Sequence, residues 1–453
     1  MTYKEAIMYI KQAEKYGSVL GLDSMRTLLS GLGNPEDKLK FVHIAGTNGK
    51  GSTAAFIANI LATAGYRTGR FISPSVFDYL EKIQITQPDT KKKDSRNESN
   101  FSVITQYIME DEVAEYTEKI SKVCQDMVKM GLSHPTVFEM ETAMAMLYFV
   151  KRKCDIVVME VGLGGRLDAT NVIRTTVCSV ITSISMDHMA VLGNTLEQIA
   201  AEKAGIIKPD IPVVSYQQDV RAAKIIGETA KINNATLITA DFSKISVKDF
   251  SLEGTEFTYD NSENLKIRLL GENQVKNAVV ALLTAKALKL KGYSISGEQI
   301  RRGLFHTTWR GRFEILKHNP LFIIDGAHNE DAARALAQNL RLYFNGRKIF
   351  FILGVLADKD YNAVLRHTAS YATRIYTITP NNRRGLNSGI LSKAATNYHK
   401  AVVDARNVSN AISLAYQAAG KEDVIIAFGS LSYLKEVYHE LGIVPFKKTF
   451  ELI

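Results

Sequence analysis

The chain has 453 residues, more than one ordinary core accommodates, so we expect two or three domains. Hydrophobic residues make up 46% of the chain and charged residues 23%, a balance that excludes an intrinsically disordered protein. The formal net charge of +9 would suit nucleic acid, but the basic residues are dispersed and no basic face interleaved with aromatic residues can be read. A positive field also suits polyanionic small molecules, so we expect these as partners and no nucleic acid.

The cysteines and the hydropathy pattern indicate the cellular compartment of the protein. Cys124, Cys154 and Cys178 have neither CxxC spacing nor paired histidines, which predicts reduced interior residues rather than a zinc site or disulfides. No apolar run approaches the length that spans a bilayer, and the N-terminus lacks the apolar core of a secretory leader. We therefore expect a cytoplasmic protein without a membrane partner.

The first half of the chain begins with apolar positions at helical spacing, which predict short surface helices within residues 1–30. A strand over 41–44 then leads through a glycine-rich turn into a helix over 53–64. The polar stretch 87–112, and above all 90–100, is predicted to be a disordered, dispensable insertion or the tip of a hairpin. Further apolar strands are predicted over residues 155–160, 177–182 and 211–215.

Apolar runs that alternate with helical segments are typical of a parallel sheet covered on both faces. Between 236 and 270 the runs become short and alternating, which predicts a small antiparallel appendage. After a helix over 274–290 the α/β pattern restarts, with strands over residues 321–325, 349–353, 374–379 and 424–428. The sequence therefore predicts an α/β protein with a first domain over 1–299 and a second over 300–453.

The glycine-rich turn lies where α/β folds bind phosphate. Small residues let backbone N–H groups converge on phosphate oxygens, and the helix N-terminus and Lys50 neutralise their charge. The turn departs from the GxxxxGK[ST] pattern, because Ile44 replaces the first glycine and Gly51 precedes Ser52, which argues against ordinary kinases and GTPases. A turn that binds nothing is the less favoured alternative. The expected nucleotide-binding residues here are Gly46, Thr47, Asn48, Gly49, Lys50, Gly51 and Ser52.

A series of segments in chain order resembles one known family over nearly the whole chain. The segments are residues 45–52, 160–171, 187–195, 202–206, 311–314, 325–329, 358–360 and 428–430. Together they resemble the folylpolyglutamate synthase/dihydrofolate synthase family of the Mur ligase superfamily. The resemblance implies a P-loop mononucleotide-binding N-terminal domain, a smaller Rossmann-like C-terminal domain that binds glutamate, and ATP at their interface.

The chemistry that the resemblance implies is ATP-dependent formation of an amide. The carboxylate of a reduced folate, tetrahydrofolate, attacks the γ-phosphate of ATP, and the amine of L-glutamate captures the acyl phosphate. Dihydropteroate is implied as a possible second acceptor, and a monomer as the expected state. The residues implied to be catalytic are Lys50, Glu160, His188, Lys203, Arg312 and His328.

Two Mg²⁺ sites are implied. Ser73 and Glu160 would hold one ion, and Glu160 ends an apolar strand, where α/β sheets place ligand groups. His188 and a carbamylated Lys203 would hold the other. The alternatives are an ion-paired carboxylate at Glu160, a packed or surface histidine at His188, and an ordinary helix lysine paired with Glu202.

The nucleotide and substrate contacts are also carried by the resemblance. Asn277 would lie beside the adenine, Arg312 beside the phosphates and Asp325 beside the ribose. His328 would lie near the phosphates or the incoming glutamate, and Ser430 would help to hold that glutamate. Without a role in binding ligands, Arg312 would lie on a solvated face and Ser430 would cap a helix. Folate is expected in a cleft bordered by Thr136, Phe138, Glu139, Leu167, Asp168 and Ala169, although Phe138 is equally compatible with a core position.

Two positions depart from the family pattern. Ser75-Val76 follows Ser73-Pro74 where the family often has His-Leu, which bears on dihydropteroate as a substrate, and Arg310 stands where a proline usually precedes Gly-Arg. Two other functions stay open: a Mur-superfamily ligase acting on a different carboxylate, such as a cell-wall enzyme, and a non-catalytic nucleotide-binding module. The second is disfavoured because Lys50, Glu160, His188 and Arg312 are all present.

Overall fold

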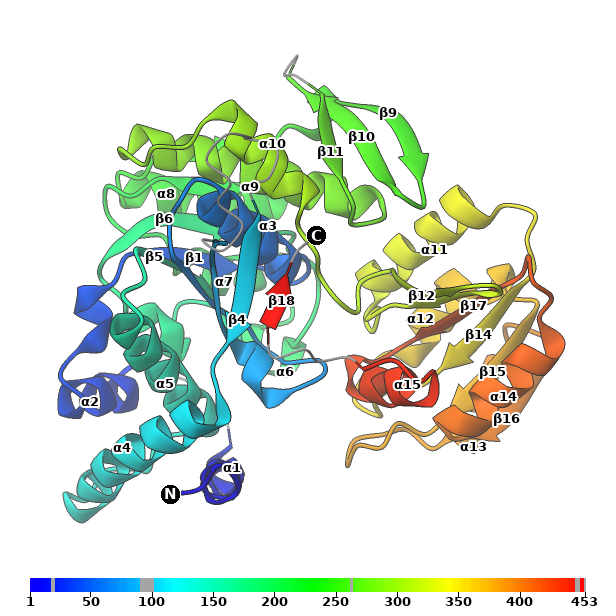
Figure 1. Cartoon of the computed structure of the whole chain (residues 1–453), viewed down its shortest axis with the longest axis horizontal. Helices are drawn as coiled ribbons and strands as arrows, with labels where there is room; N and C mark the ends of the chain where they lie inside the picture. Colours follow the sequence, from blue (N-terminus) through cyan, green and yellow to red (C-terminus); the bar gives the residue numbers. More distant parts are fainter. Residues whose placement is uncertain (18–20, 90–101, 261–263, 445–448, 452–453) are drawn as a thin grey trace.

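The computed structural model describes residues 1–17, 21–89, 102–260, 264–444 and 449–451. Two α/β domains lie side by side, and a small antiparallel sheet packs on the first (Figure 1). Among the described residues, no helix combines the length and the apolarity that a bilayer crossing requires.

The first sheet has nine strands in the described residues, in the order β18-β4-β3-β2-β5-β1-β6-β7-β8. Its parallel strands are β1 (Phe41–Ala45), β2 (Thr68–Phe71), β5 (Ile156–Glu160), β6 (Thr176–Ile181), β7 (Val213–Ser215) and β8 (Leu237–Thr239). Its antiparallel edge is formed by β3 (Ile83–Pro88), β4 (Val103–Tyr107) and β18 (Thr449–Glu451). The four strands predicted from apolar runs in this half are confirmed as β1, β5, β6 and β7.

Helices cover both faces of this sheet because its central strands are mainly apolar on both sides. In β1, Phe41 contributes to one core and Val42 and Ile44 to the other, as the two-residue period of a strand requires. The first core is closed by α1 (Tyr3–Gln12), α2 (Asp23–Gly31), α4 (Glu110–Lys129) and α5 (Val137–Lys151). The second core is closed by α3 (Lys50–Thr63), α9 (Glu272–Leu290) and α10 (Gly297–Phe305). The strands β6 and β7 are flanked by α6 (Met189–Leu192), α7 (Leu196–Ala204) and α8 (Val220–Ile232).

One sequence expectation needs correction, and another is confirmed in one of its alternatives. The antiparallel appendage is present as β9 (Ile245–Ser251), β10 (Gly254–Tyr259) and β11 (Leu265–Ile267), but it does not begin at 236, because β8 pairs in parallel with β7 in the main sheet. For the polar stretch 87–112 the hairpin alternative is confirmed, since β3 and β4 pair as a hairpin, and α4 begins within the stretch at Glu110. The part predicted to be disordered, 90–100, lies outside the described residues.

The second sheet has six strands within the described residues, in the order β12-β13-β17-β14-β15-β16. They are β12 (Glu314–His318), which is antiparallel, and the parallel β13 (Leu321–Ile324), β14 (Ile349–Leu353), β15 (Arg374–Ile378), β16 (Val402–Arg406) and β17 (Val424–Phe428). One face is covered by α11 (Glu330–Phe344), α12 (Tyr361–Thr368) and α13 (Ser388–Ala395), and the other by α14 (Val408–Ala418) and α15 (Leu434–Glu440). All four strands predicted in this half are confirmed.

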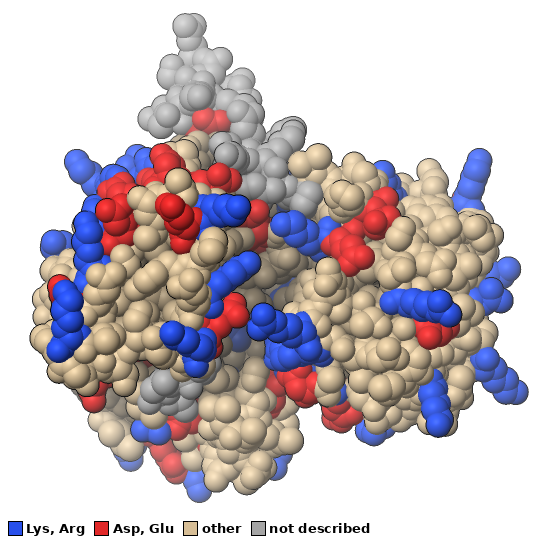
Figure 2. All heavy atoms as spheres, turned by 90° about the horizontal axis from the view of Figure 1, so that it is seen from below, with Lys and Arg blue, Asp and Glu red and all other residues tan. Residues whose placement is uncertain are grey.

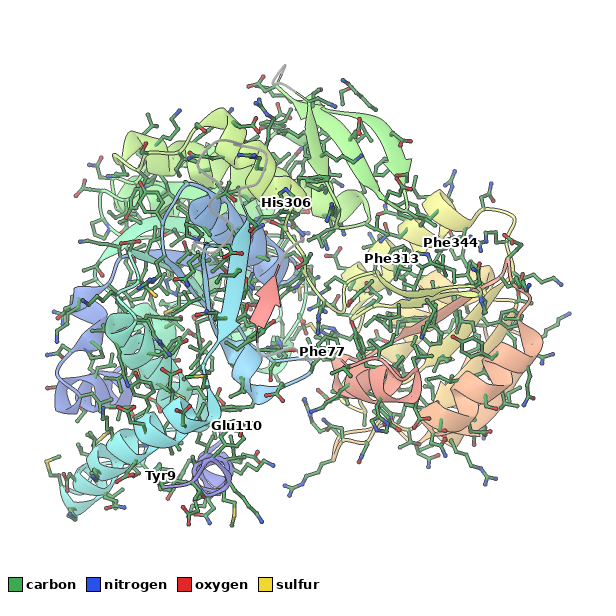
Figure 3. All side chains as sticks on the ribbon, viewed as in Figure 1. Tyr9, Phe77, Glu110, His306, Phe313 and Phe344 are labelled. Atoms are coloured by element: carbon green, nitrogen blue, oxygen red, sulfur yellow. The ribbon has the colours of Figure 1, made fainter. Side chains whose placement is uncertain are left out.

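The junction between the domains is more interwoven than a single boundary at residue 300 implies. Helix α10 packs on α3, and β18 pairs with β4, so segments on both sides of that position belong to the first domain. Phe77 of the first domain packs on Tyr438 of α15 with ring centroids 4.5 Å apart (Figure 3). The division into 1–299 and 300–453 stays a prediction.

The surface and the cysteines agree with the composition. Lys and Arg side chains are scattered among Asp and Glu over both domains on the face that Figure 2 draws, rather than gathered into a basic stripe. The three cysteines are buried and free, and burial raises the pKa of each thiol to about 12, so they are inert interior residues.

Candidate active site

A cleft between the domains gathers the carboxyl ends of strands from both sheets. Residues that follow β1 and β5 line one side, and residues that follow β13 and β17 line the other. This is where open α/β sheets bind their ligands. The cavity volume is about 530 Å³, within the range of roughly 300–1,000 Å³ found for small-molecule sites.

The phosphate loop forms one wall of this cleft. Gly46 and Gly49 have positive φ values of 155° and 86°, and a side chain at Gly46 would collide with Thr182. Helix α3 begins at Lys50, whose Nζ donates to the carbonyl oxygens of Gly46 and Thr47 at 3.1 and 3.3 Å. The lysine is therefore folded back over the loop that it is predicted to serve.

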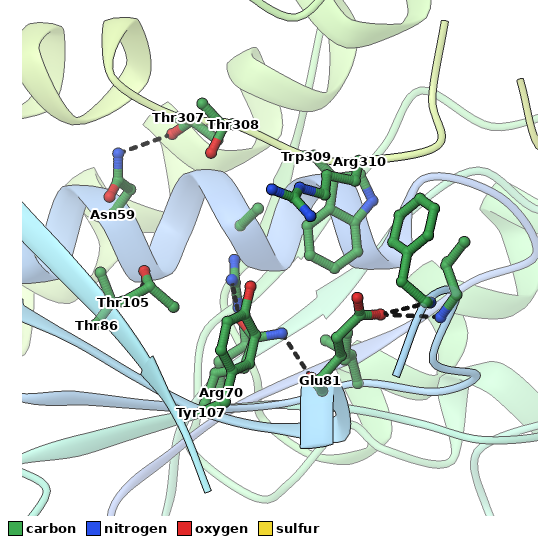
Figure 4. Close-up of a pocket in the computed structure, with 15 residues that line it drawn as sticks. Asn59, Arg70, Glu81, Thr86, Thr105, Tyr107, Thr307, Thr308, Trp309 and Arg310 are labelled. Carbon is green, nitrogen blue, oxygen red and sulfur yellow. Dashed lines mark hydrogen bonds between the residues drawn. The ribbon is translucent and has the colours of Figure 1, made fainter. Parts of the chain in front are cut away.

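The unusual Gly51 has a steric explanation. A Cβ added at Gly51 would lie 2.6 Å from Trp309 Cζ2, in the segment that joins the domains. Trp309 also separates the phosphate loop from a second, smaller cavity, where its indole faces Arg70 at 5.1 Å and where Asn59 of α3 donates to Thr307 (Figure 4). The departure from the standard loop pattern thus makes room for the linker to pack on α3.

Glu160 lies beside the phosphate loop at the end of β5. Its Oε1 is 4.0 Å from Lys50 Nζ, and the nearby backbone N–H of Ser73 favours its ionised form. Burial raises the pKa of Glu160 to about 7, and Lys50 and Arg312 oppose that rise. Ser73 and Glu160 therefore line the same cleft, and their role as Mg²⁺ ligands stays a prediction.

His188 and Lys203 are the residues predicted to hold the second Mg²⁺. They line a small cavity next to the main cleft, together with Gly46, Lys50 and Asp187. Lys203 is 4% exposed, and its Nζ donates to Gly46 O at 2.9 Å. Burial lowers the pKa of Lys203 to about 7, and Lys50 adds to the effect. His188 has a left-handed backbone with φ 51°, and its pKa is lowered by burial.

The site offers too few ligand side chains to coordinate a metal ion with protein atoms alone. Among the described residues, no group of three or more His, Cys, Asp or Glu side chains could hold an ion by itself. Mg²⁺ commonly takes one or two carboxylates and completes its octahedron with phosphate oxygens and water. Glu160 with Ser73 fits that mode.

Direct contacts cross the cleft next to the phosphate loop. Lys359 Nζ lies 3.2 Å from Asp187 Oδ1, and Asn329 Nδ2 donates to Asp187 Oδ2 at 3.3 Å. Asn48 of the loop donates to Asp331 at 3.1 Å. Burial alone would raise the pKa of Asp187, but His188 and Lys359 outweigh it and lower the pKa to about 2. The carboxylate is thus ionised and joins the two domains.

The second domain contributes the remaining predicted groups. Asp325 accepts from the backbone N–H groups of Phe313 and Ala327, both at 2.8 Å, and Arg312 lies against Gly326. His328 Nδ1 is 2.8 Å from Gly326 O, and burial lowers the pKa of His328 to about 4. Ser430 lines the cleft and also caps the short 3₁₀ helix that follows it, since its Oγ accepts from Ser432 N at 3.2 Å.

Comparison with known proteins agrees with this geometry. The family model described as "Mur ligase middle domain" matches residues 105–285, and that described as "Mur ligase, glutamate ligase domain" matches 311–431. A dihydrofolate synthase/folylpolyglutamate synthase of Bacillus subtilis is 32% identical over 449 residues, covering 97% of this chain and 99% of that protein. The chain belongs to the folylpolyglutamate synthase/dihydrofolate synthase family.

Solved structures of family members share the fold. Mycobacterium tuberculosis folylpolyglutamate synthase, complexed with ADP and AMPPCP, matches with a TM-score of 0.84 at 28% identity and covers 98% of this chain and 100% of its own. E. coli FolC in complex with DHPP and ADP matches with a TM-score of 0.81 at 28% identity and covers 96% of this chain and 97% of its own. The predicted fold class and family are confirmed.

The residues expected to border folate do not line the interdomain cleft. Thr136 and Glu139 form a capping box at the start of α5, with Thr136 N donating to Glu139 Oε2 at 2.7 Å. Phe138 packs on Gly162, where an added Cβ would lie 2.6 Å from its ring. Leu167 is half-buried, and Ala169 is 8% exposed. These six positions stay predictions as folate contacts.

Asp168 organises the glycine-rich turn that follows β5. Its two oxygens accept from Leu163 N and Thr170 N, each at 2.9 Å, and from Thr170 Oγ1 at 2.5 Å. Thr170 Oγ1 also lies 2.8 Å from Nε2 of His43, a fully buried residue of β1. Since Thr170 uses its proton toward the carboxylate, His43 Nε2 must be the donor to Thr170. This chain of bonds ties the turn to the centre of the sheet.

Several residues of the site were not predicted from the sequence. Asp187, Asn329 and Lys359 lie inside the segments that carry the family resemblance, and that position could have identified them. Trp309 could have been noticed as the only tryptophan. No local pattern marks His43, because its role depends on Thr170, far away in the sequence.

Proposed function

We propose that the chain catalyses the ATP-dependent addition of L-glutamate to a reduced folate, tetrahydrofolate, through an acyl phosphate. The observation that carries this proposal is the convergence of Lys50, Glu160 and Arg312 on one interdomain cleft, with Lys203 in the small cavity that adjoins it at Lys50. Each of these residues suits a reaction in which anions must approach each other.

In the first step, the folate carboxylate attacks the γ-phosphate. Backbone N–H groups of the phosphate loop, Lys50 and Arg312 lower the repulsion between the two anions. Two Mg²⁺ ions, held by Ser73 and Glu160 and by His188 and Lys203, would supply further charge screening when bound. Lys50 leaves its contacts with Gly46 O and Thr47 O to reach the nucleotide.

In the second step, the amine of glutamate attacks the acyl carbon and phosphate leaves. The amine must first lose a proton. That proton passes to solvent, because a pKa of about 4 makes His328 too weak a base to hold it. His328 would instead orient the neutral amine, since Nδ1 donates to Gly326 O and Nε2 of the neutral ring can accept a hydrogen bond. Ser430, in the same cleft, would help to hold the glutamate.

We assign carbamylation to Lys203 as part of this function. A carbamate forms when a neutral amine attacks CO₂ and releases a proton. The lowered pKa of Lys203 leaves much of the amine neutral near pH 7, whereas an exposed lysine is almost wholly charged. The product carries a carboxylate, which suits the pair that His188 and Lys203 would form around the second Mg²⁺.

The test is ADP release by the purified protein with ATP, Mg²⁺ and L-glutamate, with tetrahydrofolate and dihydropteroate compared as acceptors. Turnover with tetrahydrofolate confirms the proposal, and turnover with both acceptors would establish a bifunctional enzyme despite Ser75-Val76. Turnover with neither would redirect the assignment to another Mur-superfamily ligase. We further propose that the enzyme is cytoplasmic, in keeping with its free thiols, and, from the resemblance to its family, that it is a monomer.

A further inference from the structure

The smaller cavity behind Trp309 is polar and has room for a ligand. It lies between α3, the strands β2, β3 and β4, and the segment that joins the domains (Figure 4). Its volume is about 70 Å³, whereas a single water requires roughly 10–15 Å³. The cavity can therefore hold several waters or one small ion. Among the described residues that line it, none also lines the interdomain cleft.

Arg70 of β2 brings a buried positive charge to this cavity. The residue is 7% exposed, and burial lowers the pKa of its guanidinium to about 10, so the group stays protonated at neutral pH. One face of the guanidinium lies on the indole of Trp309, 5.1 Å from the ring centre (Figure 4). Stacking uses the face of the plane, and the N–H groups point outward from its edge.

The protein supplies few acceptors to this guanidinium. Arg70 Nη2 donates to the side-chain oxygen of Gln84, and Arg70 Nε has no hydrogen-bond partner among the described residues. Tyr107, Glu160 and Glu81 oppose the fall in the pKa of Arg70 through space. Glu81, however, accepts from two backbone N–H groups at 3.0 and 3.1 Å, and Glu160 lies beside Lys50. A buried charge without a paired counter-ion is costly, and a bound anion would relieve that cost.

Arg310 adds a second cation to the same cavity. This arginine stands where the family usually has a proline, and it takes no part in the proposed reaction. Its guanidinium carbon lies 5.9 Å from the centre of the Phe77 ring. Burial raises the pKa of Glu81, and Arg310 opposes that rise together with two backbone N–H groups. The described lining thus sets two arginines against the single carboxylate of Glu81, which leaves an excess of positive charge.

We propose that this cavity is a binding site for a small oxyanion, a phosphate or a carboxylate, and that Arg70 is its principal ligand. The planar fork of a guanidinium donates two parallel hydrogen bonds to such a group. The hydroxyl groups of Thr86 and Thr105 are hydrogen-bonded to each other at 3.0 Å, so one of them keeps a proton for the anion. Because Trp309 also packs on Gly51, the occupant would lie one side chain away from the phosphate loop.

The experiment separates this cavity from the phosphate loop, which also attracts phosphate. All proteins therefore carry Lys50→Met, and dissociation constants of inorganic phosphate are measured by calorimetry without nucleotide, at an ionic strength held constant with chloride. The test proteins add Arg70→Met or Arg70→Gln, so that the comparison survives if one of them does not fold. The matched control adds Arg174→Met, which removes one exposed positive charge. A second series uses acetate in place of phosphate.

The expected result is saturable binding of phosphate or acetate to the Lys50→Met protein and to the Arg174→Met control. Both Arg70 variants should bind about tenfold more weakly or worse, as the loss of a charge-assisted hydrogen bond requires. The tighter of the two anions identifies the class of ligand. Equal affinities with and without Arg70, or binding of neither anion to the Lys50→Met protein, would overturn the inference. The proposed function would stand in either case, because it does not depend on this cavity.

Discussion

Replacing Thr170 with valine tests the buried chain of bonds from His43 through Thr170 to Asp168. The substitution keeps the shape of the side chain and removes its hydroxyl. The hydroxyl bond to a carboxylate is worth about 1.5–3 kcal/mol, and the His43 N–H left unpaired costs about 1–3 kcal/mol. Burial lowers the pKa of His43 to about 3, so this ring cannot escape by protonation at neutral pH. Allowing for partial relaxation, we expect a loss of about 3 kcal/mol in the free energy of unfolding.

The matched control is Thr284→Val in α9. Thr284 is also fully buried, but its hydroxyl bonds to the carbonyl of Val280 within the same helix, at 2.8 Å. Such a back-bond contributes little, so the control should change stability by less than about 1 kcal/mol.

Urea unfolding followed by tryptophan fluorescence measures both variants, because the only tryptophan, Trp309, packs on α3 of the first domain. With a slope of about 3 kcal/mol per molar urea, the Thr170→Val midpoint should fall by about 1 M relative to wild type, and that of the control by less than about 0.3 M. Equal midpoints for the two variants would refute the reasoning that the Thr170 hydroxyl bridges two buried polar groups.

Three further predictions concern the site. Gly51→Ala should displace Trp309, which would shift the tryptophan emission and raise the KM for ATP about tenfold. The control is Gly227→Ala in α8, where no atom lies within 4 Å of the added Cβ, and it should change neither the emission nor the KM. An unchanged emission spectrum for Gly51→Ala would contradict the packing argument. Carbamylation of Lys203, read by NMR with ¹³C-bicarbonate, should rise as the pH rises through about 7, because the neutral amine then predominates, and should be absent in Lys203→Arg; a signal that persists in that variant would place the carbamate elsewhere. Glu160→Gln should abolish turnover, yet in EDTA at pH 8 its free energy of unfolding should exceed that of wild type, because the raised pKa means that ionisation of Glu160 destabilises the fold. This difference in stability should shrink as the pH falls below about 7, where Glu160 becomes protonated in the folded protein. A difference independent of pH would show that the Glu160 charge is not the cause.

Local patterns in the sequence were enough to place the main strands and the phosphate loop. The strands β14 and β17 are continuous apolar runs, and β1 and β5 depart from this only at His43 and Glu160, because a strand buried on both faces takes mainly apolar residues. The edge strands β3 and β4 were missed because they mix polar and apolar residues, and β8 because three residues carry too little pattern.

By itself, the sequence determined the elements whose physical cause is local: apolar strands, the glycines of the phosphate loop, and the motifs that mark Lys50, Glu160 and Lys203. Only the tertiary structure decided which partners the polar side chains find. Thr136 and Glu139 cap their own helix, Asn277 donates to Gln274, and Lys359 reaches Asp187 across the cleft. Hydrogen bonds and ion pairs are short-ranged, so their partners are set by where distant segments return in space, which no local period encodes.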